Sequence, residues 1–188
     1  MEETLKQRPS NCLKIVMFGP ESTGKTTLSK QLAKHFKTQW VPEYMRTYLE
    51  AKWEKYKETI VKNDLLPIAK GQITSENKLV LKSNNVLFCD TNLLEIEVYS
   101  KYYNDGFCPS EISEAFKTHT YDFYFLTDID VPWEFDKLRD RPDERENMFR
   151  MFENQLINYD LPYITLKGSK LQRFEFAVKH INKLLNKK

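Results

Sequence analysis

The 188-residue sequence predicts an α/β fold, in which a five-stranded parallel sheet carries helices on both faces. Two observations support this prediction. Short apolar runs alternate along the chain with amphipathic runs of helical period, as in proteins whose parallel strands are joined by helices. Residues 19–26 (GPESTGKT) also match the spacing of a phosphate-binding P-loop, and they lie between an apolar run and an amphipathic one. The sequence therefore predicts the P-loop NTPase/kinase fold.

The expected strands and helices follow in order from the apolar pattern. The first strand, residues 13–18, leads into the P-loop, and the helix after the loop has Leu28, Leu32 and Ala33 on its apolar side. The other strands are expected at residues 38–41, 86–90, 121–127 and 161–166. Helices are expected at residues 64–82, 91–103, 111–119 and 171–185, and residues 43–48 are expected to begin a helical or loop segment. A charged run at residues 134–150 follows the fourth strand and continues into a helix.

Length and composition favour a single domain over residues 13–188, preceded by a polar N-terminal tail at residues 1–12. The formal net charge is +2, so no basic field indicates a nucleic-acid partner. The first residues lack the apolar core of a signal peptide, and no apolar run approaches the roughly 20 residues that a membrane span needs. We therefore expect a cytoplasmic protein without a membrane partner. The three cysteines form no C-x-x-C pair, so neither a disulfide framework nor a zinc site is indicated.

The P-loop residues supply the chemistry for binding a triphosphate. Glycines let the backbone curl so that successive N–H groups point at phosphates, and the helix start adds partial positive charge. Lys25 is expected to reach the β- and γ-phosphates, and the Thr26 hydroxyl to ligate Mg²⁺. The alternative is a chance match in a turn. The residues expected to bind ATP are Gly19, Glu21, Ser22, Thr23, Gly24, Lys25, Thr26 and Thr27.

Polar residues follow the second and third strands, at the edge of the sheet where ligands collect. Asp90 is expected to hold Mg²⁺ or contact the substrate, and it can also cap the helix that follows. Glu43 either accepts the proton of an attacking hydroxyl or stabilises the dipole of a helix. Arg46 is expected to hold Glu43 in place or to touch a substrate group.

Asp130 and Trp133 come just past the fourth strand, where they are candidates for substrate binding. Trp133 follows a proline in a polar context, so it is either core or a ring that stacks on a flat, cationic base. Arg139 and Arg145 belong to the charged run. That run is either a solvated helix or a lid after the fourth strand, which brings arginines to the migrating phosphoryl group and excludes water.

A guanine-specific GTPase is not indicated. Such a protein carries an Asn-Lys-x-Asp box, whereas residues 61–64 read VKND, in the wrong order. It also carries a glycine three residues after the aspartate of the third strand, where this chain has Leu93. The length leaves a small-molecule kinase as the simplest reading.

Four segments carry more distinctive patterns: residues 19–28, 41–48, 90–94 and 130–139, followed by Arg145. Together they resemble the ribosylnicotinamide kinase domain of NadR-type proteins, in order and over nearly the whole chain. The resemblance implies transfer of a phosphoryl group from ATP, with Mg²⁺, to the ribose 5′-hydroxyl of the nucleoside nicotinamide riboside, giving nicotinamide mononucleotide. It also implies that Trp133 stacks on the pyridinium ring, with Glu43 and Asp90 near the ribose and the metal.

NadR-type proteins commonly carry an adenylyltransferase domain with a His-x-Gly-His motif, and no histidine of this chain forms that motif. We therefore expect the kinase part to stand alone. Met45 and Asn92 depart from the family pattern, where alanine and aspartate are expected, and the change at position 92 bears on a ribose or metal contact. Two alternatives stay open: a kinase for another nucleoside or small metabolite, and a regulatory ATP-binding module. The sequence carries no signal for an oligomeric state.

Overall fold

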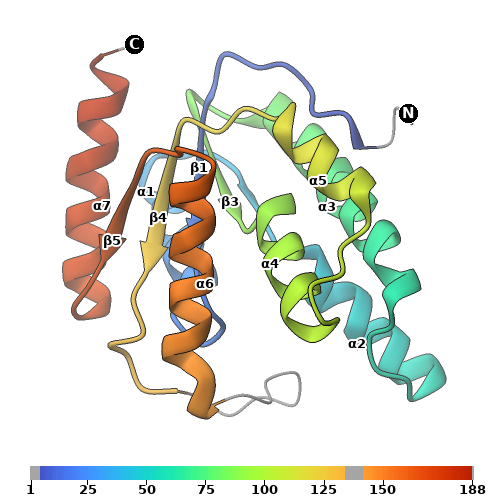
Figure 1. The fold of residues 1–188 in the computed structure, drawn as a ribbon. Helices are drawn as coiled ribbons and strands as arrows, with labels where there is room; N and C mark the ends of the chain where they lie inside the picture. Colours follow the sequence, from blue (N-terminus) through green and yellow to red (C-terminus); the bar gives the residue numbers. More distant parts are fainter. Residues whose placement is uncertain (1–4, 134–141, 188) are drawn as a thin grey trace.

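The computed structural model describes residues 5–133 and 142–187, and within them five strands form one sheet (Figure 1). The strand order is β2-β3-β1-β4-β5, and every neighbouring pair is parallel. The strands are β1 (Leu13–Phe18), β2 (Trp40–Val41), β3 (Val86–Asp90), β4 (Phe123–Thr127) and β5 (Tyr163–Leu166). The predicted five-stranded parallel sheet is confirmed.

Strand β1 lies at the centre of the sheet, and its neighbours are both distant in sequence. Ile15 lies opposite Phe88 of β3 and Phe123 of β4. All residues of β1 are buried, which explains why the sequence shows a continuous apolar run there rather than an alternating one. The chain moves from β1 outward to β2 and β3, and then crosses back to β4. The loop after β1 therefore lies at the point where the strand order reverses, which is where ligands bind in open α/β sheets.

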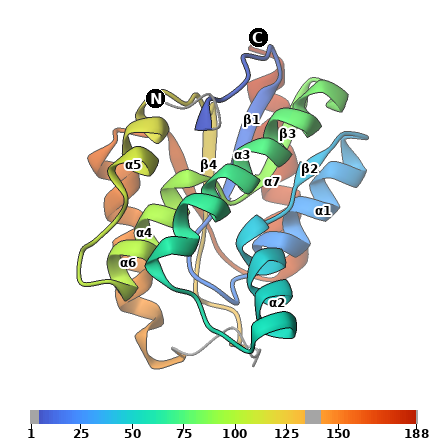
Figure 2. The ribbon, with the colours of Figure 1, turned by 90° about the vertical axis from the view of Figure 1, so that its right-hand side faces the viewer.

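Helices cover both faces of the sheet (Figures 1 and 2). Ile15 and Met17 of β1 pack with α1 and α7 on one face, whereas Val16 and Phe18 pack with α3, α4 and α6 on the other. Successive residues serve opposite cores because side chains alternate along a strand. The helices are α1 (Lys25–His35), α2 (Tyr44–Tyr56), α3 (Leu65–Leu79), α4 (Leu93–Tyr103), α5 (Ser110–Lys117), α6 (Arg145–Asn158) and α7 (Lys170–Leu185).

Some predicted elements differ in extent from the structure. Strand β2 is shorter than residues 38–41, because the Thr38 N–H donates to the Ala33 carbonyl at the end of α1 (2.9 Å) and cannot join the ladder. The predicted helix at residues 64–82 is α3 with a short 3₁₀ turn at each end. The predicted lid begins outside the described residues, and its described part is a 3₁₀ turn, Pro142–Glu144, that leads into α6.

The described part of the predicted N-terminal tail packs against the domain. Leu5 is buried in the core, and the Arg8 N–H donates to Asn77 Oδ1 on α3 (2.7 Å). Residues 5–12 therefore run along the body of the domain rather than away from it.

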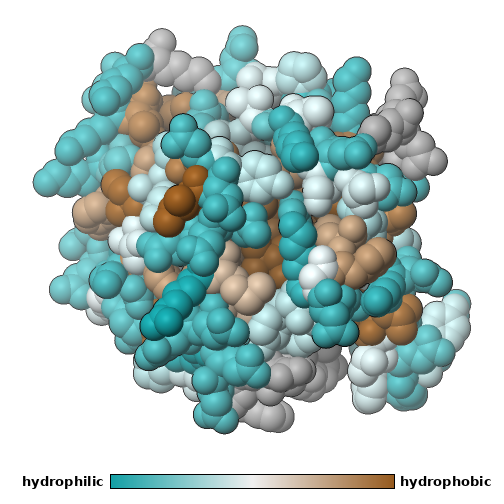
Figure 3. All heavy atoms as spheres, viewed as in Figure 1, coloured by the Kyte–Doolittle hydropathy of each residue, from teal (hydrophilic) through white to brown (hydrophobic). Residues whose placement is uncertain are grey.

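Exposed apolar side chains are spread over the surface. Figure 3 shows hydrophilic residues over most of one face, with smaller hydrophobic areas between them. The most exposed large hydrophobic residues, Leu81, Leu171 and Ile157, come from three different elements. Within residues 5–133 and 142–187, no helix combines the length and apolarity that crossing a membrane requires.

A charged pair is buried at the end of the sheet away from the P-loop. Lys14 Nζ of β1 lies 2.9 Å from Glu76 Oε1 of α3, and both side chains are at most 5% exposed. The Tyr121 hydroxyl donates to Glu76 Oε2 (2.8 Å), and Gln7 Nε2 donates to Oε1 (2.7 Å). This carboxylate therefore joins β1, α3, the residues just before β4 and the N-terminal segment.

Removing that carboxylate should destabilise the protein. We expect Glu76→Ala to lower the free energy of unfolding by about 3–5 kcal/mol, because the Lys14 ammonium stays buried without its partner. Urea unfolding measures the change. Glu146→Ala is the control: Glu146 is 83% exposed and lies 3.9 Å from Arg150, so its removal should cost less than about 0.5 kcal/mol. Equal losses in the two variants would contradict a structural role for the buried pair.

Candidate active site

Two glycines shape the loop between β1 and α1. Gly19 has a φ of +133° and Gly24 a φ of +85°, values that favour glycine. A Cβ atom on Gly19 would lie 2.8 Å from the hydroxyl oxygen of Thr127 and 3.0 Å from its carbonyl oxygen. The loop therefore passes β4 at a distance that only glycine permits, and the predicted arrangement of strand, loop and helix is present.

Arg173 of α7 ties this loop to the ends of β4 and β5. Its Nη1 donates to the Thr23 carbonyl (2.8 Å), and its Nη2 donates to the Asp128 carbonyl (3.0 Å). Its Nε donates to the Gly168 carbonyl (3.0 Å), and Nη2 also pairs with Asp130. Because Arg173 is buried, these bonds hold the loop at a fixed distance from α7.

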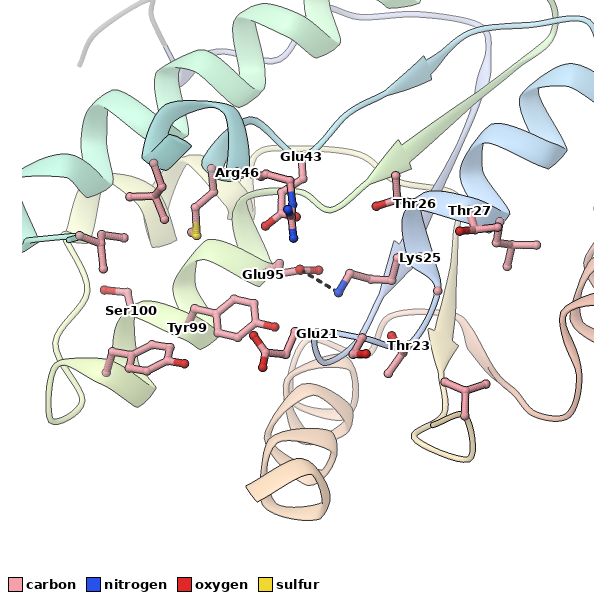
Figure 4. Close-up of a pocket in the computed structure, with 18 of the residues that line it drawn as sticks. Glu21, Thr23, Lys25, Thr26, Thr27, Glu43, Arg46, Glu95, Tyr99 and Ser100 are labelled. Carbon is pink, nitrogen blue, oxygen red and sulfur yellow. Dashed lines mark ion pairs between the residues drawn. The ribbon is translucent and has the colours of Figure 1, made fainter. Parts of the chain in front are cut away.

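Lys25, the first residue of α1, turns back over the loop. Its ammonium donates to the carbonyls of Gly19 (2.6 Å) and Pro20 (3.0 Å), and it lies 3.2 Å from Glu95 Oε1 of α4. Figure 4 marks this ion pair and shows Glu95 reaching toward Lys25 from the opposite wall. The predicted phosphate-binding lysine is thus within reach of a carboxylate that comes from a different element.

Three carboxylates act on the charge of Lys25. Burial alone would lower the pKa of Lys25, but the charges of Glu95, Glu43 and Asp90 outweigh it, and the pKa is raised. Burial also raises the pKa of Glu95 to about 8 and that of Asp90 to about 6. Acidic groups therefore outnumber the ammonium here, and the surroundings favour their neutral forms.

Thr26 and Asp90 fit the requirements of a Mg²⁺ ion bound with a nucleotide. The Thr26 hydroxyl donates to Asp90 Oδ2 (2.5 Å), whereas Asp90 Oδ1 is buried and has no hydrogen-bond partner among the described residues. Hydroxyl and carboxylate oxygens are ligands that Mg²⁺ prefers, and this ion usually completes its shell with phosphates and water. Within residues 5–133 and 142–187, no three His, Cys, Asp or Glu side chains form a group that could hold a metal ion by themselves.

A cleft of about 1270 Å³ extends from the P-loop to α2 and α4 (Figure 4). The end near the P-loop is polar. The far end is lined mainly by apolar and aromatic side chains: Met45, Leu49, Trp53, Ile60, Val61, Leu65, Tyr99 and Tyr103. The cleft therefore joins a site suited to phosphates with a compartment suited to a flat ring.

Glu43 precedes α2 and is positioned by α3. The Tyr44 N–H donates to Gln72 Oε1 of α3 (2.8 Å). A Cβ atom on Gly71 would lie 2.0 Å from the Tyr44 ring, so α2 approaches α3 as closely as a glycine allows. Figure 4 shows Glu43 and Arg46 lying on the wall of the cleft that faces the P-loop.

Most of the predicted site residues meet in this cleft. Those that line it are Glu21, Ser22, Thr23, Gly24, Lys25, Thr26, Thr27, Glu43 and Arg46. Gly19 and Asp90 lie directly behind the lining, through their hydrogen bonds to Lys25 and Thr26. Arg139 lies outside the described residues.

Asp130 is a surface residue whose side chain does not line the cleft. One of its oxygens pairs with Arg173, and the other accepts from the Gly168 N–H (2.6 Å). Burial opposes its charge, but the Gly168 N–H and the Arg173 guanidinium lower the pKa of Asp130. These bonds give Asp130 a structural role, and its predicted contact with the substrate stays a prediction.

Trp133 and Arg145 also lie outside the lining of the cleft, although Val131 and Pro132 belong to it. Trp133 is half-buried. Arg145 donates from Nη1 to the Val131 carbonyl (2.9 Å), and it lies close enough to Glu21 of the P-loop for their charges to interact. Trp133 directly follows two lining residues, and Arg145 is bonded to one of them, but neither side chain forms part of the wall.

The sequence analysis missed three residues that the structure brings to the site: Glu95, Tyr99 and Arg173. A signal for Glu95 was present, because it interrupts an apolar run whose neighbours Leu94 and Ile96 are buried. A carboxylate in such a run needs a partner. Arg173 gave no signal, since its helix reads as an ordinary amphipathic one.

Comparison with known proteins agrees with this architecture. A family model described as "AAA domain" matches residues 14–173. The trifunctional NAD biosynthesis/regulator protein NadR of Escherichia coli (strain K12) is 26% identical over 151 residues, which cover 77% of this chain and 37% of NadR. NadR of Salmonella typhimurium (strain LT2) is 28% identical over 125 residues, covering 66% of this chain and 30% of NadR. The chain thus spans about a third of the length of these curated relatives.

Solved structures share the fold. A crystal structure of NadR protein in complex with NR superposes with a TM-score of 0.76 at 22% identity, covering 92% of this chain and 49% of that one. A deoxyadenosine kinase from M. mycoides superposes with a TM-score of 0.66 at 15% identity, covering 91% and 100%. A thymidylate kinase from Ehrlichia chaffeensis does so with a TM-score of 0.60 at 18% identity, covering 94% and 100%. The P-loop kinase fold and the similarity to NadR are confirmed.

Arg173 offers a test of the loop's support. We expect Arg173→Lys to weaken ADP binding about tenfold and to destabilise the domain by about 2–4 kcal/mol, because one ammonium cannot replace the fork of donors. Isothermal titration with ADP and urea unfolding measure the two effects. Arg150→Lys, at a side chain that is 76% exposed, is the control and should change neither. Wild-type ADP affinity in Arg173→Lys would show that the loop keeps its shape without the guanidinium.

Proposed function

The chain belongs to the AAA domain family, and we propose that it is a small-molecule kinase that transfers the γ-phosphoryl group of ATP to the ribose 5′-hydroxyl of nicotinamide riboside. One observation supports this proposal most directly. Lys25 of the P-loop and Glu43 of α2 lie on facing walls of one cleft, close enough for their charges to interact. A phosphate donor held at Lys25 therefore faces a carboxylate suited to take the proton of an acceptor alcohol.

Each polar residue of the cleft has a place in this reaction. The P-loop N–H groups and Lys25 bind the phosphates, and the loop's attachment through Arg173 keeps these donors in position during transfer. Glu43 accepts the proton that the 5′-hydroxyl loses as it attacks the γ-phosphorus. Thr26 and Asp90 would hold Mg²⁺, which supplies charge neutralisation at the phosphate oxygens.

We assign Arg145 to the same step, with Arg139 as its companion in the predicted lid. Among the described residues, Nε and Nη2 of Arg145 have no hydrogen-bond partner although both are buried, and Arg145 lies near Glu21 of the P-loop. Unpaired N–H donors of a guanidinium suit the negative charge that spreads over the oxygens of a phosphoryl group in transfer.

The acceptor is proposed from two features taken together. The far end of the cleft is aromatic, with Trp53, Tyr99 and Tyr103 in its lining. The acidic side chains of Glu21 and Glu43 also line the cleft, so a cationic ring is favoured over an anionic one. The similarity to NadR supports nicotinamide riboside, whose pyridinium ring is flat and positively charged.

The reaction is tested by its product. With ATP and Mg²⁺, we expect ADP release that depends on nicotinamide riboside and exceeds release with neutral nucleosides at least tenfold, together with formation of nicotinamide mononucleotide. Glu43→Gln should lower kcat about 100-fold or more while ATP affinity stays near that of the wild type. Lys25→Met should lose both turnover and ATP binding.

The outcomes separate the competing functions. Preference for another nucleoside or for a nucleotide would identify a kinase of the same fold with a different acceptor, as in the deoxyadenosine and thymidylate kinases. Tight ATP binding without any phosphorylated product would indicate a regulatory module, and Glu43→Gln would then change nothing.

The ring that stacks on the pyridinium can be located by substitution. We propose Trp133 for this role, and Trp53 is the matched alternative because it lines the cleft. Trp133→Ala should raise the KM for nicotinamide riboside about 5- to 30-fold, as expected from the loss of a cation–π contact, without changing the KM for ATP. A rise in Trp53→Ala alone would place the pyridinium against α2.

A further inference from the structure

Glu95 has a position that the proposed reaction does not yet use. It lies in the first turn of α4, its side chain is only 2% exposed, and it lines the cleft beside Lys25. Apart from Lys25, neither of its oxygens has a hydrogen-bond partner among the described residues. A buried carboxyl group with one partner therefore stands where the phosphates of a nucleotide must come.

Phosphate binding must take that partner away. The Lys25 ammonium has three N–H donors, and Gly19, Pro20 and Glu95 are their nearest acceptors in the structure. The two carbonyls belong to the loop itself, whereas Glu95 approaches from across the cleft (Figure 4). A phosphate oxygen that binds Lys25 from the cleft side thus replaces Glu95.

The displaced carboxyl group cannot remain an anion at low cost. The displaced group would face the negative charge of the phosphates. The charged groups of other elements that act on it or on the neighbouring Tyr99 are acidic: Glu43 before α2, Asp90 at the end of β3 and Glu21 of the loop. Arg46 of α2 is a cation in the same lining, beside Glu43 (Figure 4). Lys25 then binds the phosphates. Tyr99, on the same helix as Glu95, is neutral because burial raises the pKa of Tyr99 well above the usual range. The neutral form of Glu95 removes the repulsion and supplies an O–H donor.

We propose that Glu95 is a catalytic residue that acts as a neutral acid and donates a hydrogen bond to a phosphate oxygen of the bound nucleotide. The proton comes from solvent when the phosphates displace Glu95 from Lys25, and it returns when the nucleotide leaves. Burial already raises the pKa of Glu95 to about 8 in the protein without nucleotide. Below that pH Glu95 is mostly protonated before ATP binds, so little proton is taken up. Above it Glu95 is mostly ionised, so the uptake approaches one proton per ATP. The proposal rests on nucleotide binding at the P-loop, and it is independent of the acceptor's identity.

Binding of ATP to the full chain, measured without acceptor from pH 6.5 to 9.5, tests the proposal. Wild-type affinity should fall by up to about tenfold per pH unit above pH 8 relative to Glu95→Gln, whose amide donates at every pH. Calorimetry in two buffers of different ionisation enthalpy measures the number of protons taken up per ATP. At pH 9 the wild type should take up nearly one proton more than Glu95→Gln. Protonation of ATP itself contributes equally to the measurements on both proteins, so it cancels in their difference.

Two further variants test whether Glu95 donates a hydrogen bond to the phosphates or only balances the charge of Lys25. Glu95→Ala should bind ATP about tenfold more weakly than Glu95→Gln at pH 7, because it has no donor. Glu97→Gln is the matched control: Glu97 is the other buried carboxylate of α4, it pairs with Lys101 (2.5 Å), and its variant should keep the wild-type pH profile.

The proposal is overturned if Glu95→Ala and Glu95→Gln both bind ATP more tightly than the wild type, since Glu95 would then only compete for Lys25. A ratio of wild-type to Glu95→Gln affinity that does not vary with pH overturns it equally. Failure of every protein to bind ATP would instead refute the proposed function.

Discussion

The structure of the site depends on one buried guanidinium. Arg173 bonds to the P-loop at Thr23 and to the ends of β4 and β5 at Asp128 and Gly168, so three segments that are distant in sequence share a single side chain. Together with the close passage of Gly19 past Thr127, this bonding fixes the curvature that aims the loop's N–H groups. Lys25 can bend back over the loop only because that curvature places the carbonyls of Gly19 and Pro20 within its reach.

The second constraint is charge. The Lys25 ammonium interacts with the charges of Glu43, Asp90 and Glu95, and it is itself buried. Bringing a polyphosphate to such a place calls for the carboxyl groups to be neutralised by a proton or by Mg²⁺, or to be drawn away. The protein accordingly keeps Asp90 bonded to the Thr26 hydroxyl and leaves Glu95 bound to little besides Lys25. This arrangement is the basis of the proposed link between the protonation of Glu95 and nucleotide binding.

Much of this arrangement was accessible from the sequence because it is carried by local pattern. The apolar run of β3, Val86–Asp90, was predicted to the residue, and the P-loop spacing placed the site at the end of β1. Thr38 was misjudged, since nothing in its own segment shows that its N–H is taken by the end of α1. Contacts across the fold were beyond reach for the same reason: the bond of Asp130 to Arg173 joins residues 43 apart in the chain.

Asn92 is a second residue whose role could not be predicted from the sequence. It departs from the aspartate expected by resemblance, yet its Oδ1 accepts from the Leu94 N–H at the start of α4 and its Nδ2 donates to the buried Tyr124 hydroxyl (2.9 Å). The side chain is fully buried and absent from the lining of the cleft. Only the three-dimensional structure shows that the amide serves the core here.

The two sides of the cleft have separate structural supports, and one of them is the close packing of α2 on α3 at Gly71. The wall that carries Glu43 and Arg46 is anchored by Gly71 and Gln72, and the wall that carries the P-loop is anchored by α7. Substitutions along α2 can therefore change the wall that carries Glu43 and Arg46, which is the acceptor side in the proposed reaction, and leave the P-loop side intact. If the proposed reaction is right, related proteins can thus differ in the alcohol they phosphorylate while their P-loop and its contacts with α7 stay the same.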